Sequence, residues 1–443
     1  MATAENVVES IPDEVDLFAP LLQQNVIKDD FDQEYLPVNA IQAGAPIEFS
    51  IKTADDLYLD LDESRFIVTA KITKANGTDM DGNVRAAPVN LLLHSLFREI
   101  TASLNDTPVS DPNPLYPYRA YLETLLNYSE DVQKYRLITE GWVKDTAGQM
   151  SVTSLAADGA NIGLKDRATR FATSTVVELV GRPHLDIFHQ NRLIPPGTAL
   201  RIKFIPSSNQ FVCISPPPAD NAQQEQFKVA IQNVSFMIRT KKHSETIHLA
   251  ILKNLLLKNI RLPYTKVQVK HLTIPANVTS QDFDGIYDGV LPDLVVVGLV
   301  ADEDFAGHYN RNPFNFQAFH VNRMEMLRNG VRTPRYSYTP NFGTKQSAKD
   351  YTQFLAQLKL DKGDKCVALT TDEWANGYTL YSFQITDGPI GSGAHSPRSA
   401  ISTGKMRLSI GFSEANNASI KVILFSQSVG FLDFNQYHNV VAT

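Results

Sequence analysis

The second half of the chain repeats the order of local signals found in the first half. In the first half the turn pair Asn105-Asp106 precedes an amphipathic stretch over residues 118–125, and in the second half the turn pair Asn329-Gly330 precedes one over residues 351–358. The two turns lie 224 residues apart (329 minus 105). A repeat of this length is too long for a solenoid unit and predicts two similar domains in tandem.

The match extends toward the end of each half. Residues 197–204 resemble residues 404–412, and each segment is followed by one more strand-like run. This later pair is offset by only 207 residues (404 minus 197). The first copy therefore carries extra residues, which we expect within 129–173. We expect this segment and residues 343–347 to lie in outward loops.

Most of the chain has the pattern of β-strands. Leu57, Leu59 and Leu61 alternate with polar residues, which predicts a strand with one buried face. The β-branched run over residues 294–297 is typical of a strand buried on both faces. The pattern favours an all-β fold of two tandem eight-stranded antiparallel jelly-roll sandwiches, a double jelly roll with a few short helices.

Helical spacing is confined to a few segments. The stretches at 118–125 and 351–358 predict one helix in each copy. A third helix is predicted over residues 244–258, where Ser244 can cap the N-terminus and Ile247, Ala250, Ile251 and Leu255 form one apolar face. It has no counterpart in the repeat, so it is interpreted as the linker between the copies.

These signals predict five regions along the chain. They are an acidic N-terminal arm over residues 1–33, a first jelly roll over 34–242, a linker helix over 243–258, a second jelly roll over 259–435 and a C-terminal tail over 436–443.

Negative charge is concentrated at the start of the chain. Residues 1–34 hold nine carboxylates and Lys28, a net charge of −8, whereas the whole chain carries −7. The arm therefore lacks the clustered Lys and Arg that neutralise nucleic-acid phosphates. Val15, Phe18, Leu22 and Val26 recur near helical spacing. Two interpretations stay open: a segment that docks on a partner or a neighbouring copy, and a disordered acidic tail.

Bulk properties exclude some protein classes. No apolar run approaches the ~20 residues that span a bilayer. The first 30 residues lack the pattern of a signal peptide, so we expect the chain to be made and kept inside a cell at first. Cys213 and Cys366 lie in different halves and predict two isolated thiols, not a disulfide framework or a cysteine zinc site.

Two groups of side chains resemble metal ligands. His184 and His189 flank Asp186, but residues five apart on a strand face opposite sides, so we expect no shared ion. No His-x-His pair of the cupin type occurs. A second group of acidic residues lacks the central glycine of a tight calcium loop, and a solvated strand face is the favoured interpretation for its members: Asp55, Asp56, Asp60, Asp62 and Glu63.

No other motif predicts catalysis. Gly391-Ser392-Gly393 has neither the Lys-Ser/Thr of a phosphate-binding loop nor the spacing of a nucleophile elbow. A weak basic cluster is interpreted as a solubility feature at the domain junction, in preference to nucleic-acid contact; its members are Arg239, Lys241, Lys242, Lys253 and Lys258. No catalytic, cofactor-binding or metal-ligating residue is predicted, and no cofactor. The pattern favours a structural or interaction protein over an enzyme.

The blocks that carry the duplication also resemble the major capsid proteins of adintoviruses and Polinton (Maverick) elements. The most specific is Tyr116-Pro117-Tyr118-Arg119-Ala120-Tyr121. The resemblance follows the chain in order, through residues 45–49, 90–97, 116–128, 141–142, 144–148, 181–186, 312–316 and 377–381. In the arm it rests only on Asp16-Leu17-Phe18.

The resemblance implies a double jelly roll whose homotrimers form pseudo-hexagonal capsomers. These would tile an icosahedral shell around double-stranded DNA, in contact with each other, a penton protein and minor capsid proteins. It implies assembly inside the host cell and location in the virion capsid, without sequence-specific nucleic-acid binding; contact with a membrane is left open. The alternative from the residues alone is a tandem β-sandwich module that binds carbohydrate or protein. A sandwich hydrolase would need clustered carboxylates or histidines, which the spacing does not supply.

Overall fold

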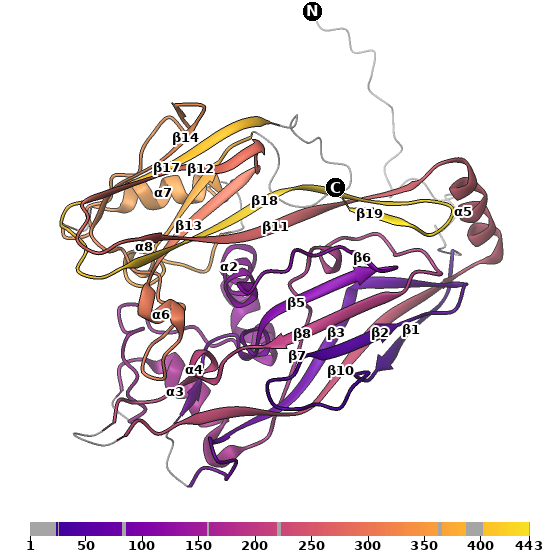
Figure 1. Cartoon of the computed structure of the whole chain (residues 1–443), viewed down its shortest axis with the longest axis horizontal. Coiled ribbons are helices and arrows are strands. Elements are labelled where there is room, and N and C mark those ends of the chain that lie inside the picture. Colours follow the sequence, from indigo (N-terminus) through magenta and orange to yellow (C-terminus); the bar gives the residue numbers. More distant parts are fainter. Residues whose placement is uncertain are drawn as a thin grey trace, which may run out of the picture.

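Two β-sandwiches lie side by side in the computed structural model (Figure 1). The structure describes residues 24, 26–81, 86–156, 159–218, 223–344, 346–361, 366–386 and 402–442. The expected arm through residue 23 and the Gly391-Ser392-Gly393 segment lie outside these ranges. Within them, no helix has the length and apolar character needed to cross a membrane.

The first sandwich consists of two four-stranded antiparallel sheets. One sheet has the order β1 (Ile27–Tyr35), β10 (Phe227–His243), β3 (Leu57–Lys74) and β7 (Val177–Gly181). The other has the order β2 (Ile47–Ile51), β8 (Leu200–Pro206), β5 (Phe97–Leu104) and β6 (Thr107–Pro108). A separate pair joins β4 (Ala87–Pro88) to β9 (Cys213–Ile214).

The second sandwich is built in the same way. Its first sheet has the order β11 (Ile260–Ile274), β18 (Ile420–Phe434), β13 (Leu294–Ala301) and β16 (Leu380–Gln384), with β19 (Val440–Ala442) paired to β18. Its second sheet has the order β12 (Ser280–Val290), β17 (Thr403–Phe412), β14 (Val321–Arg328) and β15 (Val331–Arg332).

The two sandwiches share one strand order. When the eight sheet strands of each are counted along the chain, one sheet runs 1-8-3-6 and the other 2-7-4-5 in both. Neighbouring strands in a sheet are therefore distant in sequence, as in a jelly roll made of Greek keys. The predicted fold class, a double jelly roll with few helices, is confirmed.

Each sandwich carries one principal helix at the same place in its strand order. Helix α2 (Tyr116–Asn127) lies between β6 and β7, and α7 (Ala348–Gln357) lies between β15 and β16, as the repeat predicts. Helix α5 (Glu245–Leu257) joins β10 to β11 at one end of the molecule (Figure 1). The remaining short helices are α1 (Leu92–Ser95), η1 (Val132–Arg136), η2 (Leu137–Glu140), α3 (Ile162–Arg170), η3 (Ala172–Ser174), η4 (Asp186–Phe188), α4 (Asn209–Val212), α6 (Asp302–Ala306) and α8 (Thr371–Ala375).

The linker helix differs in detail from its prediction. Ser244 occupies the N-cap position, but its side chain makes no capping hydrogen bond. On the predicted apolar face Ile247 and Ile251 are half-buried and Leu255 is buried, whereas Ala250 is exposed.

Near each end of the chain, a segment expected to be an arm or a tail forms a strand of a sheet. Strand β1 begins at Ile27 and pairs with β10, so residues 27–33 belong to the first sandwich and not to a separate arm. Strand β19 pairs with β18, so the expected C-terminal tail adds a strand to the second sandwich. Extended segments beside an open edge gain ladder hydrogen bonds that the sequence pattern does not reveal.

Three members of the basic cluster are paired with acidic side chains of the first sandwich. Arg239 Nε lies 2.5 Å from Asp30 Oδ1, and Lys241 Nζ lies 2.5 Å from Asp60 Oδ2. Lys242 Nζ lies 2.5 Å from Asp56 Oδ2. These cations therefore offset Asp56 and Asp60, two of the acidic residues that resembled calcium ligands.

The strand over residues 57–62 was expected to have one solvent-exposed face, and this prediction was wrong. Tyr58 and Asp60 are buried as well as Leu59 and Leu61. Helix α5 contacts Tyr58, whose Oη lies 3.1 Å from Nδ1 of His248, and Asp60 is paired with Lys241 of β10.

The extra residues of the first copy do not form one outward loop as expected. Within 129–173 the chain forms η1, η2 and α3 and buries Trp142, Asp145 and Arg167. Only part of the segment, including Ala156 and Ala160, is exposed.

Candidate functional site: the buried junction between the sandwiches

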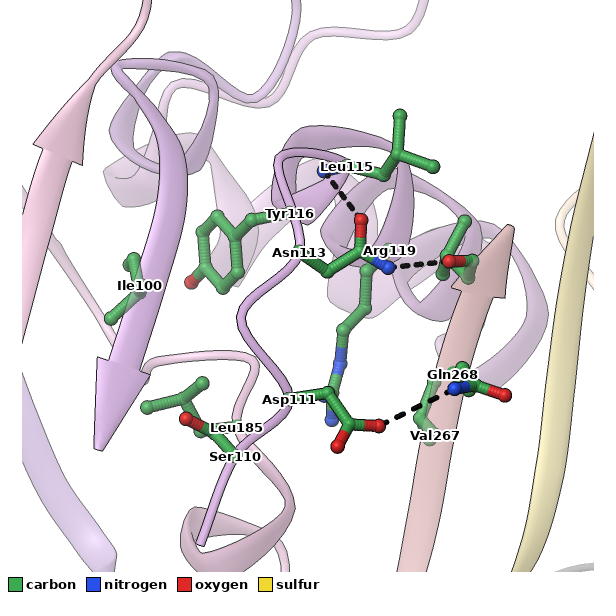
Figure 2. A pocket seen from close by; sticks show the side chains of 11 residues that line it. Ile100, Ser110, Asp111, Asn113, Leu115, Tyr116, Arg119, Leu185, Val267 and Gln268 are labelled. Carbon is green, nitrogen blue, oxygen red and sulfur yellow. Dashed lines mark hydrogen bonds between the residues drawn. The ribbon is translucent and has the colours of Figure 1, made fainter. Parts of the chain in front are cut away.

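The segment that leads into α2 is bonded to the first strand of the second sandwich. Asn113 Nδ2 donates to the carbonyl of Val269 in β11, and Asn113 Oδ1 accepts from the backbone N–H of Leu115 at 3.0 Å (Figure 2). Gln268 Nε2 lies 3.5 Å from Asp111 Oδ2 (Figure 2). This contact fixes the start of α2 against β11.

Helix α2 presents three polar residues of one face to the junction. Pro117 is tolerated in the first turn because the backbone N–H groups there have no intrahelical partner. Tyr116, Arg119 and Glu123 follow at intervals of three and four residues, which places them on one side. Tyr116 and Glu123 are buried and the Arg119 side chain is only 12% exposed, so each needs a partner.

Arg119 is shared between two carboxylates. Its Nε donates to Glu123 Oε1 at 3.0 Å, and its Nη2 donates to Asp186 Oδ1 at 2.5 Å. Burial alone would lower the pKa of Arg119, but the charges of Asp186 and Glu123 outweigh burial and raise it. Asp186 also accepts the backbone N–H of Val267 in β11 at 3.2 Å, which links the ion pair to the second sandwich.

The two carboxylates respond differently to burial. Burial raises the pKa of Asp186, and the Arg119 charge offsets this only in part. Burial would also raise the pKa of Glu123, but Arg119 and the hydrogen bond from His184 together hold it well below its usual range. Glu123 is therefore the more readily ionised of the two carboxylates.

Histidines surround the same helix face. His94 Nδ1 lies 2.9 Å from Tyr116 Oη, and His94 Nε2 lies 3.1 Å from Glu140 Oε2. Burial and the neighbouring His184 lower the pKa of His94 to about 4, so its imidazole is neutral at pH 7. His184 Nδ1 lies 2.5 Å from Glu123 Oε2.

His184 and His189 come together, and the expectation that they face apart was wrong. The chain between them forms the short helix η4, not a strand, so strand parity does not apply. Their ring centroids are 5.5 Å apart. Glu123, His184 and His189 each offer a possible metal-ligand atom, and these atoms lie within 4.8 Å of one another.

A second buried network joins three segments that are distant in sequence. Asp145 Oδ1 accepts from Arg167 Nη2 at 2.8 Å, and both side chains are almost completely buried. Asn312 Nδ2 donates to Asp145 Oδ2 at 3.2 Å, and Tyr378 Oη donates to the Asp145 carbonyl at 2.7 Å. Asn312 and Tyr378 belong to the second sandwich. Three of the sequence blocks that carry the capsid resemblance thus meet at one contact.

Helix α5 carries three exposed leucines. Leu249, Leu256 and Leu257 are 55%, 68% and 85% exposed. Contiguous exposed apolar patches are typical of interaction surfaces, so the role of these leucines in assembly can be tested. Sequence reasoning identified this helix only as a linker, because periodicity does not show which face a neighbouring element covers.

No model of a known protein family matches the chain. An uncharacterised protein of Caenorhabditis elegans, F54H12.2, is 23% identical over 362 residues, which cover 79% of this chain and 82% of that protein.

Solved structures share the fold over nearly the whole length. A chain from the cryo-EM structure of the Sputnik virophage has a TM-score of 0.63 at 12% identity and covers 99% of this chain and 93% of its own. The Faustovirus major capsid protein has a TM-score of 0.57 at 10% identity, with coverage of 94% and 92%. The mavirus major capsid protein has a TM-score of 0.53 at 10% identity, with coverage of 100% and 93%.

Proposed function

We propose that the chain is a viral major capsid protein, a structural subunit and not an enzyme. The observation that carries the proposal is the shared strand order of the two sandwiches. Similarity to the Faustovirus and mavirus major capsid proteins along more than nine-tenths of the chain supports it. The sequence blocks that resemble adintovirus and Polinton capsid proteins support the same assignment.

The proposed assembly unit is a homotrimer. Three chains with two similar sandwiches each supply the six similar corners of a pseudo-hexagonal capsomer. Closed rotational symmetry then ends the assembly of chains at this capsomer. The buried junction supports this assembly, because two sandwiches that share buried hydrogen bonds and a continuous apolar core behave as one rigid building block.

The proposal extends to the shell. Capsomers tile an icosahedral capsid around double-stranded DNA, and the chain is located in this capsid after assembly inside the host cell. A penton protein and minor capsid proteins complete the lattice. Within the chain, the division proposed is a first roll from residue 27 to 242, the linker helix over 243–258 and a second roll from 259 that includes β19.

Light scattering combined with electron microscopy tests the function. The purified chain of 49.3 kDa should elute as a trimer and form hexagonal tiles or closed particles. A monomer that forms no particles at any concentration or salt would overturn the assignment.

One observation favours the alternative of a binding module. A cavity of about 550 Å³ between the sandwiches is lined in part by Tyr118, Phe211 and Phe305. Two of these rings stack on each other, since Tyr118 and Phe305 have centroids 5.5 Å apart and planes 22° from parallel. Ring faces that are already stacked offer little surface to a sugar, so the capsid function is preferred.

A further inference from the structure

Two groups of possible metal ligands share His184 at the base of the junction. One consists of His94, Glu140 and His184, and the other of Glu123, His184 and His189. In the first group His94 already uses both ring nitrogens, one toward Tyr116 and one toward Glu140. In the second group Nε2 of His189 is buried and has no hydrogen-bond partner. A buried polar atom without a partner is costly and calls for an explanation such as a bound ion.

The charges around this group are unbalanced. Three carboxylates lie in the network, on Glu123, Glu140 and Asp186, against the single guanidinium of Arg119. Counted without the imidazoles, these four groups carry a net formal charge of −2. The nearby Arg182 does not change this count, because it is paired with Asp62. Buried charge without compensation is strongly unfavourable, and one divalent cation balances it.

We propose that Glu123, His184 and His189 bind one zinc ion. Two imidazoles and one carboxylate form a ligand set that zinc uses, with a fourth position for water. Calcium and magnesium prefer sites made of oxygen atoms alone, so the two imidazoles exclude them. The proposal does not depend on the capsid function.

The geometry requires a small rearrangement. Bonds of about 2.0–2.2 Å place the ligand atoms of a tetrahedral zinc site about 3.4 Å apart. The possible ligand atoms lie within 4.8 Å of one another, and His184 Nδ1 lies 2.5 Å from Glu123 Oε2, so side-chain movements of about 1 Å bring them to this spacing. Arg119 lies behind Glu123 and orients its carboxylate from the outer shell.

The ion would tie α2 to the segment that contacts the second sandwich. His184 precedes η4 and His189 follows it, while Asp186 within η4 accepts the Val267 N–H of β11. Zinc at this point therefore stabilises the junction and not a distant loop.

Metal content and thermal unfolding of the full chain test the proposal. After incubation with zinc and removal of free metal, we expect about one zinc per chain by mass spectrometry of the elements. Dipicolinate should remove it and lower Tm by at least about 3 °C. The His189→Gln variant should hold less than a tenth of this zinc, and its Tm should not respond to chelator. The matched control is His308→Gln, which removes an exposed imidazole and should retain zinc.

Three outcomes overturn the site. They are wild-type protein without zinc after incubation, zinc retained in His189→Gln, and zinc lost equally in the control. If His189→Gln does not fold, X-ray absorption of the zinc-loaded wild-type chain decides. A shell of two imidazoles and one carboxylate supports the site, and any other protein-ligand set refutes it.

Discussion

The ring of Tyr121, on α2 of the first sandwich, stacks on the ring of Phe314 from the second, with centroids 4.2 Å apart and planes 9° from parallel. Both side chains are completely buried. The apolar core therefore continues from one sandwich into the other, and the two should unfold together.

Truncation of this pair should destabilise the whole chain. Tyr121→Ala and Phe314→Ala should each lower the free energy of unfolding by about 3–5 kcal/mol, because each leaves a large cavity. In the double variant, the loss in free energy of unfolding should be smaller than the sum of the two single losses by about 0.5–1.5 kcal/mol. Chemical denaturation with a probe in each sandwich measures this. Tyr437→Ala, at a 73% exposed residue, is the control and should have little effect. Two separate transitions in the wild-type chain would contradict the single core.

The buried ion pair of Asp145 and Arg167 should be equally important. Arg167→Met leaves the Asp145 carboxylate buried without its cation, so the free energy of unfolding should fall by about 3–5 kcal/mol. The matched control is Arg201→Met, which breaks an exposed pair with Asp106 and should cost less than about 1 kcal/mol. Equal losses in the two variants would show that burial of the pair has no consequence.

Acid should weaken the junction through His94. The folded chain keeps this imidazole neutral down to about pH 4, whereas in the unfolded chain it is protonated near pH 6.5. Between these values the unfolded state binds more protons, so stability is present above pH 6.5 and is lost as the pH falls toward 4. Through His94, the free energy of unfolding should fall by about 3 kcal/mol over this pH range.

Denaturation curves at pH 4.5 and pH 7 for wild type and His94→Gln measure this effect. The variant should be less stable at pH 7 but should lose less between the two values. His308→Gln should behave as wild type. Parallel pH profiles of His94→Gln and wild type would exclude His94 as the cause.

Two N-terminal truncations should have different effects. Removal of residues 1–23 leaves β1 intact, so soluble trimers should persist. Removal of residues 1–35 deletes β1, exposes the edge of β10 and removes Asp30 and Asp32, two of the three carboxylates that pair with Arg239. We expect loss of soluble trimer in the longer truncation only, measured by light scattering. Loss in both would mean that residues before β1 are required for folding.

The exposed leucines of α5 should serve assembly and not folding. The double variant Leu256→Glu and Leu257→Glu changes side chains that are mostly exposed, so Tm should shift by no more than about 2 °C. Larger assemblies should be reduced or lost in electron micrographs. Leu255→Glu, at a buried position of the same helix, should instead lower Tm clearly. Normal particles from the double variant would remove α5 from the assembly surfaces.

The sequence predicted those parts of the fold that depend on local pattern. The helices at 116–127 and 348–357 follow from apolar spacing, and the duplication follows from the recurrence of turn pairs. The pairing of β1 with β10 could not be predicted, because a polar strand such as Ile27–Tyr35 has no apolar alternation and gains its place from ladder hydrogen bonds.

The junction was less accessible to sequence reasoning than the sheets. His184 and His189 were judged by strand parity, yet η4 bends the chain between them. Glu123 lies 61 residues before His184, and only the tertiary fold brings them together. The one available signal was polar: Arg119 and Glu123 lie four residues apart on an otherwise apolar helix, which predicts buried partners for both.

The identical strand order of the two sandwiches has an evolutionary consequence. Because both are encoded in a single polypeptide, a substitution alters one of them and leaves the other unchanged, unlike in a ring of six identical subunits. The first could thus acquire the insertion that contains α3 while the second retained a shorter connection. Because the two halves are covalently fused, each sandwich can change in sequence while the other keeps its original role.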